Sequence, residues 1–475
     1  MMDKKRFNFR VIALIVFATL ILGGCRDNSI TNRALYDKES IYYADYKGYP
    51  GLKSLPVGMF DSGTGGLTVM EQFLFLDSFN NETGEEGPDG IPDFDGEAFI
   101  YLADQANMPY GVYPSQGKSD FLRELIIKDA LFLTSEPYRT KIVVIACNTA
   151  TAYGLEDIRW LLERSKTGVR TVGVIEAGVD GAMSLIPSDS KSFAVGVLAT
   201  VGTISSGGYE DAIYKYAADK AYSGDVRVVN QGGLGFAEAV DSEPDYISGS
   251  AQFPRTNYRG PRYNTEDGIS CDLMKLYNFD TTGNALLVSY DESGEVADIQ
   301  LNSTGNYARF HMVTLLNKHK EQNPGVRMKS VILGCTHYPY LEDTLKKVTE
   351  ELRMYEENGE KVYASLLAEE LHFIDPAINT AKETFRILFE ENLLDRSGRG
   401  NTLAGFISVP REDLTEESRD ESGNFTFDYK YGRETGSEKP DVRIVPFSYD
   451  NINQDNLNRI RERLPLTYSL IIKEL

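Results

Sequence analysis

The sequence predicts an α/β protein built on mostly parallel sheets that are flanked by helices, and three observations indicate this fold class. Short apolar runs alternate with helix-length amphipathic stretches along the chain. The runs are nearly continuous in Val and Ile, as expected for parallel strands that are buried on both faces. The 475 residues, 41% of them hydrophobic and 25% charged, suffice for several globular domains. We expect strands over 55–60, 98–102, 141–146, 170–175, 193–199, 226–230 and 330–334.

The charge and the cysteine count exclude several functional classes. Lys and Arg number 49 against 71 Asp and Glu, which gives a net charge of −22. So acidic a surface repels phosphate backbones, and nucleic acid is therefore not an expected partner. Four cysteines and four histidines in this length form neither a disulfide scaffold nor a recognisable zinc site.

The N-terminal residues 1–24 have the features of an export signal. Basic residues precede an apolar run from Val11 to Leu22, which is too short to span a bilayer. Small residues follow, and Leu22-Gly-Gly-Cys25 resembles a bacterial lipoprotein signal, in which Cys25 would carry the lipid. We therefore expect an exported protein anchored to a membrane of the cell envelope, with 25–55 as a tether. An ordinary secretion signal is the alternative.

The ends of two expected strands carry the same arrangement of residues. Cys147 follows the run 141–146 and precedes Asn148, and Cys335 follows the run 330–334 and precedes Thr336. Ligands of open parallel sheets bind beyond the carboxyl ends of the strands, so the two thiols predict a duplicated half-site. A single cysteine after a strand is more often a small buried apolar residue. The pair of matching contexts is what favours a site.

Two further strand ends supply glycines and hydroxyls. Asp61-Ser62-Gly63-Thr64-Gly65-Gly66 follows the first run, and Thr200 follows the run 193–199. Glycines let the backbone turn and bring N–H groups close to an anion such as a carboxylate. No Lys follows them, so the motif is not a Walker loop.

Five motifs in order resemble the glutamate racemases of the aspartate/glutamate racemase superfamily. The resemblance covers about 56–240 and 307–390. The motifs are Phe60-Asp-Ser-Gly-Thr-Gly-Gly66, Met108-Pro-Tyr-Gly111, Ala146-Cys-Asn-Thr-Ala150, Val172-Gly-Val-Ile-Glu176 and Gly334-Cys-Thr-His-Tyr-Pro339. It implies two pseudo-symmetric domains with the active site in the cleft between them. The first would comprise 56–169 and 338–395, and the second 170–337.

The resemblance also implies the site residues and the chemistry, a cofactor-independent 1,1-proton transfer at the α-carbon of glutamate. Cys147 and Cys335 would be the two acid/base thiols, assisted by Asp61 and His337 respectively. The residues that would hold the substrate are Asp61, Ser62, Pro109, Tyr110, Gly111, Asn148, Thr149, Thr200, Thr336 and His337. No metal is implied, and no pyridoxal phosphate motif is visible. A homodimer is left open.

Physical chemistry agrees with two thiols. Inversion of a stereocentre needs a base on one face and an acid on the other, each sulfur about 3 to 3.5 Å from the α-carbon, so the sulfurs would lie roughly 7 Å apart. The ordinary thiol pKa of about 8.5 can be brought close to the working pH by neighbours. Amide and hydroxyl donors around the substrate carboxylate would have to stabilise the carbanion.

The chain departs from the family in several segments. The acid that supports His337 could be Glu238, Asp241 or Glu243. We expect 77–97 to be an acidic solvated loop, the alternative being a calcium site. The insertion 242–306 should contain a hairpin about 291–294 and cover the cleft. The segment 396–475 should be a charged, exposed tail as far as 443, with a helix over 451–475.

Three functions remain open at this point. The first is a racemase for glutamate, or else for aspartate or another amino acid. The second is a non-catalytic lipoprotein that binds amino acids or muropeptide fragments, which the expected export favours because family members are cytoplasmic. The third is a lyase or decarboxylase that uses one thiol, and the presence of both cysteines disfavours it.

Overall fold

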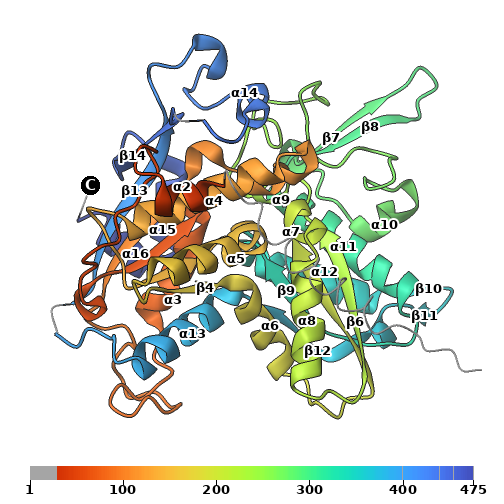
Figure 1. The fold of residues 1–475 in the computed structure, drawn as a ribbon. Coiled ribbons are helices and arrows are strands. Elements are labelled where there is room, and N and C mark those ends of the chain that lie inside the picture. The colour runs from red at the N-terminus through yellow and green to blue at the C-terminus, as the bar shows by residue number, and fades with distance from the viewer. Residues whose placement is uncertain (1–28, 398–399, 438, 453, 474–475) are drawn as a thin grey trace, which may run out of the picture.

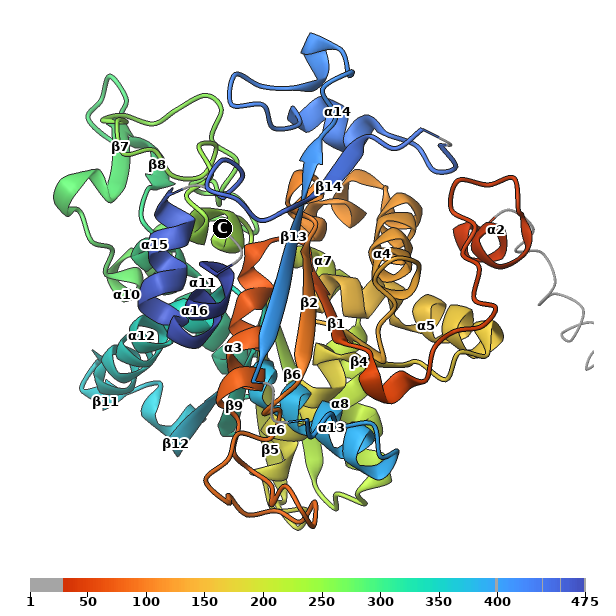
Figure 2. The same ribbon diagram turned by 90° about the vertical axis from the view of Figure 1, so that its left-hand side faces the viewer.

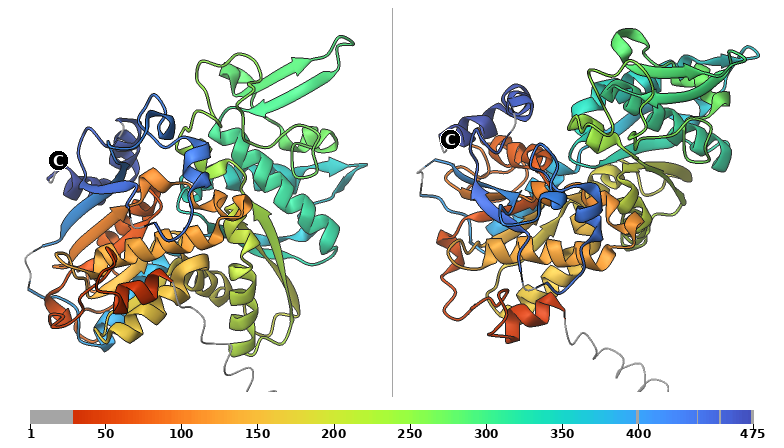
Figure 3. Two further views of the ribbon diagram at one scale, coloured as in Figure 1. Left: turned by 45° about the horizontal axis from the view of Figure 1, so that its top comes forward. Right: turned by 90° about the horizontal axis from the view of Figure 1, so that it is seen from above.

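The computed structural model describes residues 29–397, 400–437, 439–452 and 454–473, which form two lobes (Figures 1 and 3). The expected signal peptide 1–24 and Cys25 lie outside these residues. Each lobe has a largely parallel sheet with helices on both faces, which confirms the predicted fold class. Within the described residues, no helix combines the length and apolar character that a membrane crossing requires.

The first sheet has the strand order β14-β13-β2-β1-β3-β4. Its strands are parallel except β14, which pairs antiparallel with β13. The bounds are β1 Val57–Asp61, β2 Ala98–Ala103, β3 Ile142–Ile145, β4 Arg170–Gly173, β13 Thr402–Pro410 and β14 Val442–Pro446.

Helices cover both faces of this sheet because its strands are apolar on both sides. In β1, Val57 and Met59 pack into the core under α3, α13, α15 and α16, and Phe60 packs into the core under α2, α4 and α5. Figure 2 shows α3, α15 and α16 on one side of these strands and α4 and α5 on the other. The bounds are α2 Ile30–Tyr36, α3 Leu67–Phe75, α4 Ser119–Thr134, α5 Asn148–Ser165, α13 Pro376–Glu390, α15 Gln454–Arg463 and α16 Pro465–Ile471.

The second sheet is entirely parallel, with the order β12-β9-β5-β6. Helices α9, α11 and α12 share a core with one face, and α6 and α8 with the other. The strands are β5 Ser192–Ala199, β6 Asp225–Gly232, β9 Met328–Gly334 and β12 Leu367–Ile374. The helices are α6 Val174–Ser184, α7 Val201–Ser205, α8 Gly208–Asp219, α9 Phe236–Val240, α10 Met274–Tyr277, α11 Thr304–Gln322 and α12 Glu342–Met354.

The predicted domain boundaries assign two strands, β4 and β12, to the wrong lobe. β4 pairs with β3, so the second lobe begins after it and not at residue 170. β12 pairs with β9, so much of 338–395 belongs to the second lobe, and α13 returns to the first. β12 escaped prediction because it is an edge strand whose Glu369 and Glu370 are exposed, which hides the apolar pattern of a buried strand.

The segment 396–475 is not an exposed tail. β13 extends the first sheet beyond β2, and the expected single C-terminal helix is a pair, α15 and α16, packed on the same sheet. The helix α14 Phe427–Gly432 lies beside the insertion, where the guanidinium of Arg259 is 3.8 Å from the ring centre of Phe427 (Figure 1). The apolar run 403–409 was overlooked because charged stretches flank it on both sides.

The segments expected to be a tether and a solvated loop are packed as well. Residues 29–55 carry α2, whose Ile30 and Ala34 are buried against α4 and α5. Residues 77–97 do form a loop, but Phe94 lies in the core and Asp93 is fully buried. The carboxylate of Asp93 accepts the backbone N–H groups of Ser78 and Phe79, so it stabilises the loop itself.

The insertion 242–306 contains the predicted hairpin. β7 Leu286–Tyr290 and β8 Val296–Leu301 pair antiparallel about the expected turn, and Figure 3 shows them projecting from the second lobe. A second small hairpin joins β10 Glu356–Glu357 to β11 Glu360–Lys361.

Candidate active site

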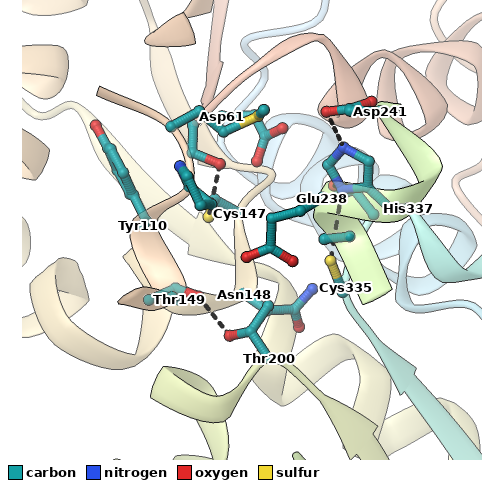
Figure 4. A pocket seen from close by; sticks show the side chains of 16 residues that line it. Asp61, Tyr110, Cys147, Asn148, Thr149, Thr200, Glu238, Asp241, Cys335 and His337 are labelled. Atoms are coloured by element: carbon teal, nitrogen blue, oxygen red, sulfur yellow. Dashed lines mark hydrogen bonds and ion pairs between the residues drawn. The ribbon is translucent and has the colours of Figure 1, made fainter. Parts of the chain in front are cut away.

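A cavity lies between the lobes, at the carboxyl ends of β1, β3, β5 and β9 (Figure 4). Its empty space, including the part open to solvent, amounts to about 440 Å³. Every residue that the sequence predicted for the site lines it. The lining residues are Asp61, Ser62, Met108, Pro109, Tyr110, Gly111, Cys147, Asn148, Thr149, Thr200, Ala237, Glu238, Asp241, Cys335, Thr336 and His337.

Cys147 sits at the start of a long helix. It is the N-cap of α5, and its sulfur accepts the backbone N–H of Ala150 at 3.4 Å and lies 3.8 Å from the hydroxyl of Ser62. Burial, followed by the negative charge of Asp61, raises the pKa of Cys147 well above its ordinary value. These neighbours thus move the pKa of Cys147 away from neutrality, and the thiol holds its proton at neutral pH.

Asp61 has one carboxylate oxygen free for a ligand. Oδ2 accepts the N–H of Gly66 at 2.7 Å. Oδ1 is buried and has no hydrogen-bond partner among the described residues. Burial raises the pKa of Asp61, against the opposing effect of the nearby His337. An unpaired buried oxygen is costly unless a bound cation or donor satisfies it.

Cys335 heads a chain of polar contacts that runs away from the cavity. Its sulfur lies 3.5 Å from Nδ1 of His337, and Nε2 of His337 lies 3.0 Å from Oδ2 of Asp241. Arg459 of α15 donates to Oδ1 of Asp241 at 2.6 Å and to the carbonyl of Val240 at 2.7 Å. Of the three acids that sequence left open, Asp241 is thus the one that contacts His337.

The opposite charges of His337 and Asp241 shift each other's pKa in the direction that keeps both groups ionised. Burial lowers the pKa of His337, but the charge and hydrogen bond of Asp241 outweigh it and raise that pKa well above 6.5. Burial raises the pKa of Asp241, but His337 and Arg459 outweigh it and bring that pKa down to about 2. The ring of His337 is therefore an imidazolium that can donate through Nδ1 to the sulfur of Cys335.

Gly65 allows the lobes to meet at this point. A Cβ placed on Gly65 would lie 2.6 Å from Cε1 of His337. A residue with a side chain here would push apart the glycine-rich turn of the first lobe and the histidine of the second. The glycine therefore sets how closely Asp61 and His337 approach each other.

Hydrogen-bond donors are oriented toward the cavity. The hydroxyl of Tyr209 donates to Oδ1 of Asn148 at 2.5 Å, which leaves the amide nitrogen of Asn148 toward the cavity (Figure 4). The hydroxyl of Thr149 lies 2.9 Å from that of Thr200 and 3.1 Å from that of Thr203. The N-terminus of α5, with its unsatisfied N–H groups and positive dipole end, adds to this set.

Several residues of the site escaped the sequence analysis. Met108, in one of the five motifs, and Ala237, next to Glu238, line the cavity, and neither was predicted as a site residue. Glu238 lines it too, where it had been considered only as a support for His337. Arg459 could not have been found, because it lies on a helix predicted only for its apolar spacing. The expectation that 242–306 covers the cleft is not met, since none of the described lining residues comes from it.

Comparison with known proteins supports the family resemblance. No protein-family model matches the chain. A glutamate racemase of Oceanobacillus iheyensis is 25% identical over 341 residues, which cover 72% of this chain and 82% of that protein. One from Enterococcus faecalis is 37% identical over 157 residues, which cover 33% of this chain and 46% of that protein. The chain is homologous to the glutamate racemases.

Solved structures of glutamate racemases are also similar to the chain. The structure from Bacillus anthracis has a TM-score of 0.45 and 20% identity, and the match covers 75% of this chain and 89% of that one. The structure from Francisella tularensis, in complex with D-glutamate, has a TM-score of 0.39 and 20% identity, with coverages of 81% and 95%. Racemases are isomerases, so the curated relatives that this chain resembles are enzymes of that class.

Proposed function

We propose that the protein is a cofactor-independent racemase that interconverts L- and D-glutamate with two thiols. The observation that carries the proposal is that Cys147 and Cys335, from corresponding strand ends of the two lobes, line one cavity as free cysteines. A two-base inversion needs an acid on one face of the α-carbon and a base on the other. The names of the homologous racemases support glutamate as the substrate.

The two thiols have different starting states. The sulfur of Cys335 lies 3.5 Å from Nδ1 of His337, whose positively charged ring can stabilise a negative charge on that sulfur. Cys147 has no such ring in the described cavity and holds its own proton, since burial and Asp61 raise its pKa. We therefore assign Cys335 as the first base and Cys147 as the first acid. The roles exchange when the other enantiomer binds.

The remaining lining groups suit an amino acid. The free Oδ1 of Asp61 is a partner for the substrate ammonium group, whose positive charge would also ease proton loss from Cys147. The amide of Asn148, the hydroxyl of Thr336 and the N-terminus of α5 can donate to the substrate carboxylate. These donors would stabilise the negative charge that develops as the α-proton leaves.

Exchange of the α-hydrogen with solvent tests the proposal directly. The purified chain, kept in reductant, should incorporate deuterium at the α-carbon of L-glutamate and of D-glutamate in D₂O, and each should yield the other enantiomer. Mass spectrometry and chiral chromatography measure the two events. Binding of D-glutamate by calorimetry without exchange would instead select a binding module. Absence of exchange with every amino acid, after a panel has been tried, would refute the racemase.

We also propose that the protein works as an exported lipoprotein, on the support of the sequence 1–25 alone. Cys25→Ser should remove the lipid and release the chain from the membrane fraction. Radiolabelled palmitate incorporation and fractionation of the producing cells measure this, with Cys271→Ser as a control that keeps the lipid. A wild-type chain found in the cytoplasm without lipid would contradict the proposal.

A further inference from the structure

Glu238 is an acidic side chain inside the cavity that the proposed chemistry does not use. It lies on α9, is 7% exposed, and its carboxylate points into the space between Cys147 and Cys335 (Figure 4). In the described structure the carboxylate receives a hydrogen bond from its own backbone N–H and forms no ion pair. Asp241, three residues later, faces His337 and Arg459 instead.

The surroundings of Glu238 do not neutralise it. His337 lies close but is already paired with Asp241. The positive charge of Lys430 on α14 lowers the pKa of Glu238 slightly, but Lys430 interacts more strongly with Glu243. The titratable and charged groups that face Glu238 from the surrounding elements are His337, Asp241, Glu243, Lys430, Tyr246, Tyr307, Tyr338 and Tyr431.

A second carboxylate in so small a space changes which substrates the cavity accepts. Glutamate carries a net charge of −1 and glutamine none, whatever their orientation in the cavity. Like charges in a buried site disfavour each other strongly, so an ionised substrate side chain and an ionised Glu238 exclude one another. An amide side chain brings no such repulsion and can donate a hydrogen bond to the carboxylate.

We propose that Glu238 is a specificity-determining residue that disfavours an ionised carboxylate on the substrate side chain and favours an amide. The inference rests on the proposed racemase function and refines its substrate class. Glutamate then binds only when either its side-chain carboxyl or Glu238 is protonated. Glutamine binds while Glu238 is ionised. Burial, as the largest cause, raises the pKa of Glu238 to about 7, so discrimination against glutamate increases as the pH rises through neutrality.

The test compares two substrates at two pH values. For the wild type, the ratio of kcat/KM for L-glutamate to that for L-glutamine should fall about tenfold or more between pH 6.0 and pH 8.5. Glu238→Gln should raise this ratio about tenfold or more at pH 8.5 and remove most of its pH dependence. Glu383→Gln is the matched control, because burial also raises the pKa of Glu383, on α13, to about 7 but Glu383 does not line the cavity, and it should leave the ratio unchanged.

The outcomes separate this inference from the proposed function. Equal effects of Glu238→Gln on both substrates, or a wild-type ratio that does not change with pH, would overturn the role of Glu238. If the wild type exchanges neither amino acid, the racemase proposal fails, and calorimetric binding of the same two amino acids still tests Glu238. The melting temperature gives an independent check on folding, because Glu238→Gln should raise it more at pH 8.5 than at pH 6.0.

Discussion

Replacing either Cys147 or Cys335 with serine is expected to lower racemisation a thousandfold or more. Both directions should be lost in both variants, because each direction needs one sulfur as base and the other as acid. A serine hydroxyl holds its proton far more tightly than a thiol and cannot supply the base. The loss should appear in kcat, since the substitution keeps the size of the side chain and most of its contacts.

Circular dichroism or chiral chromatography of the product measures the effect. Cys271→Ser is the matched control, because Cys271 is exposed and lies outside the cavity. Its activity should stay at the wild-type level. A Cys147→Ser or Cys335→Ser variant that keeps more than a tenth of the wild-type rate would remove that thiol from the mechanism.

Asp241→Asn is expected to lower activity about a hundredfold and to move the pH profile. Without the charge of Asp241, burial of His337 is no longer outweighed, and the pKa of the ring should fall from its raised position. The ring then loses its proton at a lower pH, so the alkaline limb of the profile should move toward neutrality. Initial rates measured between pH 5 and pH 10 test this shift.

The same substitution should cost about 3 kcal/mol of folding stability, because it breaks a buried ion pair. His337, with a raised pKa, contributes stability below 6.5 that is lost as the pH rises through that raised value. Asp241 contributes stability above 3.8 that is lost as the pH falls through about 2. The cost should therefore be greatest between these limits, as measured by urea unfolding.

A conservative variant separates the two roles of Asp241. Asp241→Glu keeps the charge and should recover a large part of the activity and of the pH profile. Glu243→Gln removes another nearby carboxyl, which is half-buried and does not line the cavity, and should leave the alkaline limb in place. An unchanged pH profile in folded Asp241→Asn would show that Asp241 does not set the charge state of His337.

The ends of the predicted strands placed each half of the cavity, because strand ends in a parallel sheet converge on one edge: Thr200 and Cys335 follow β5 and β9 of the second sheet, and Cys147 follows β3 of the first. That the two halves face each other was predicted only by the family resemblance. The choice of Asp241 over Glu238 could not be made this way, because a single turn of α9 decides which carboxyl faces His337. Asp241 contacts His337, whereas Glu238, three residues earlier, points into the cavity.

Other features depend on contacts between distant parts of the chain. The raised pKa of Cys147 follows from burial and from the charge of Asp61, and neither effect is visible in a linear motif. β12 and β13 escaped prediction because each is held as a strand by pairing with a neighbour that is distant in sequence, β9 and β2 respectively. The contact of Arg459 with Asp241 joins residues 218 positions apart in sequence.

That contact changes how the C-terminal segment should be regarded. β13 pairs with the edge of β2, which would otherwise expose unpaired backbone groups. Arg459 of α15 donates a hydrogen bond to the carboxylate of Asp241. A disturbance of α15 would thus reach Cys335 through Arg459, which does not line the cavity, and then through Asp241 and His337, which do. The C-terminal segment therefore supports the active site from outside the cavity. A chain truncated before residue 396 would lose both β13 and the contact of Arg459 with Asp241.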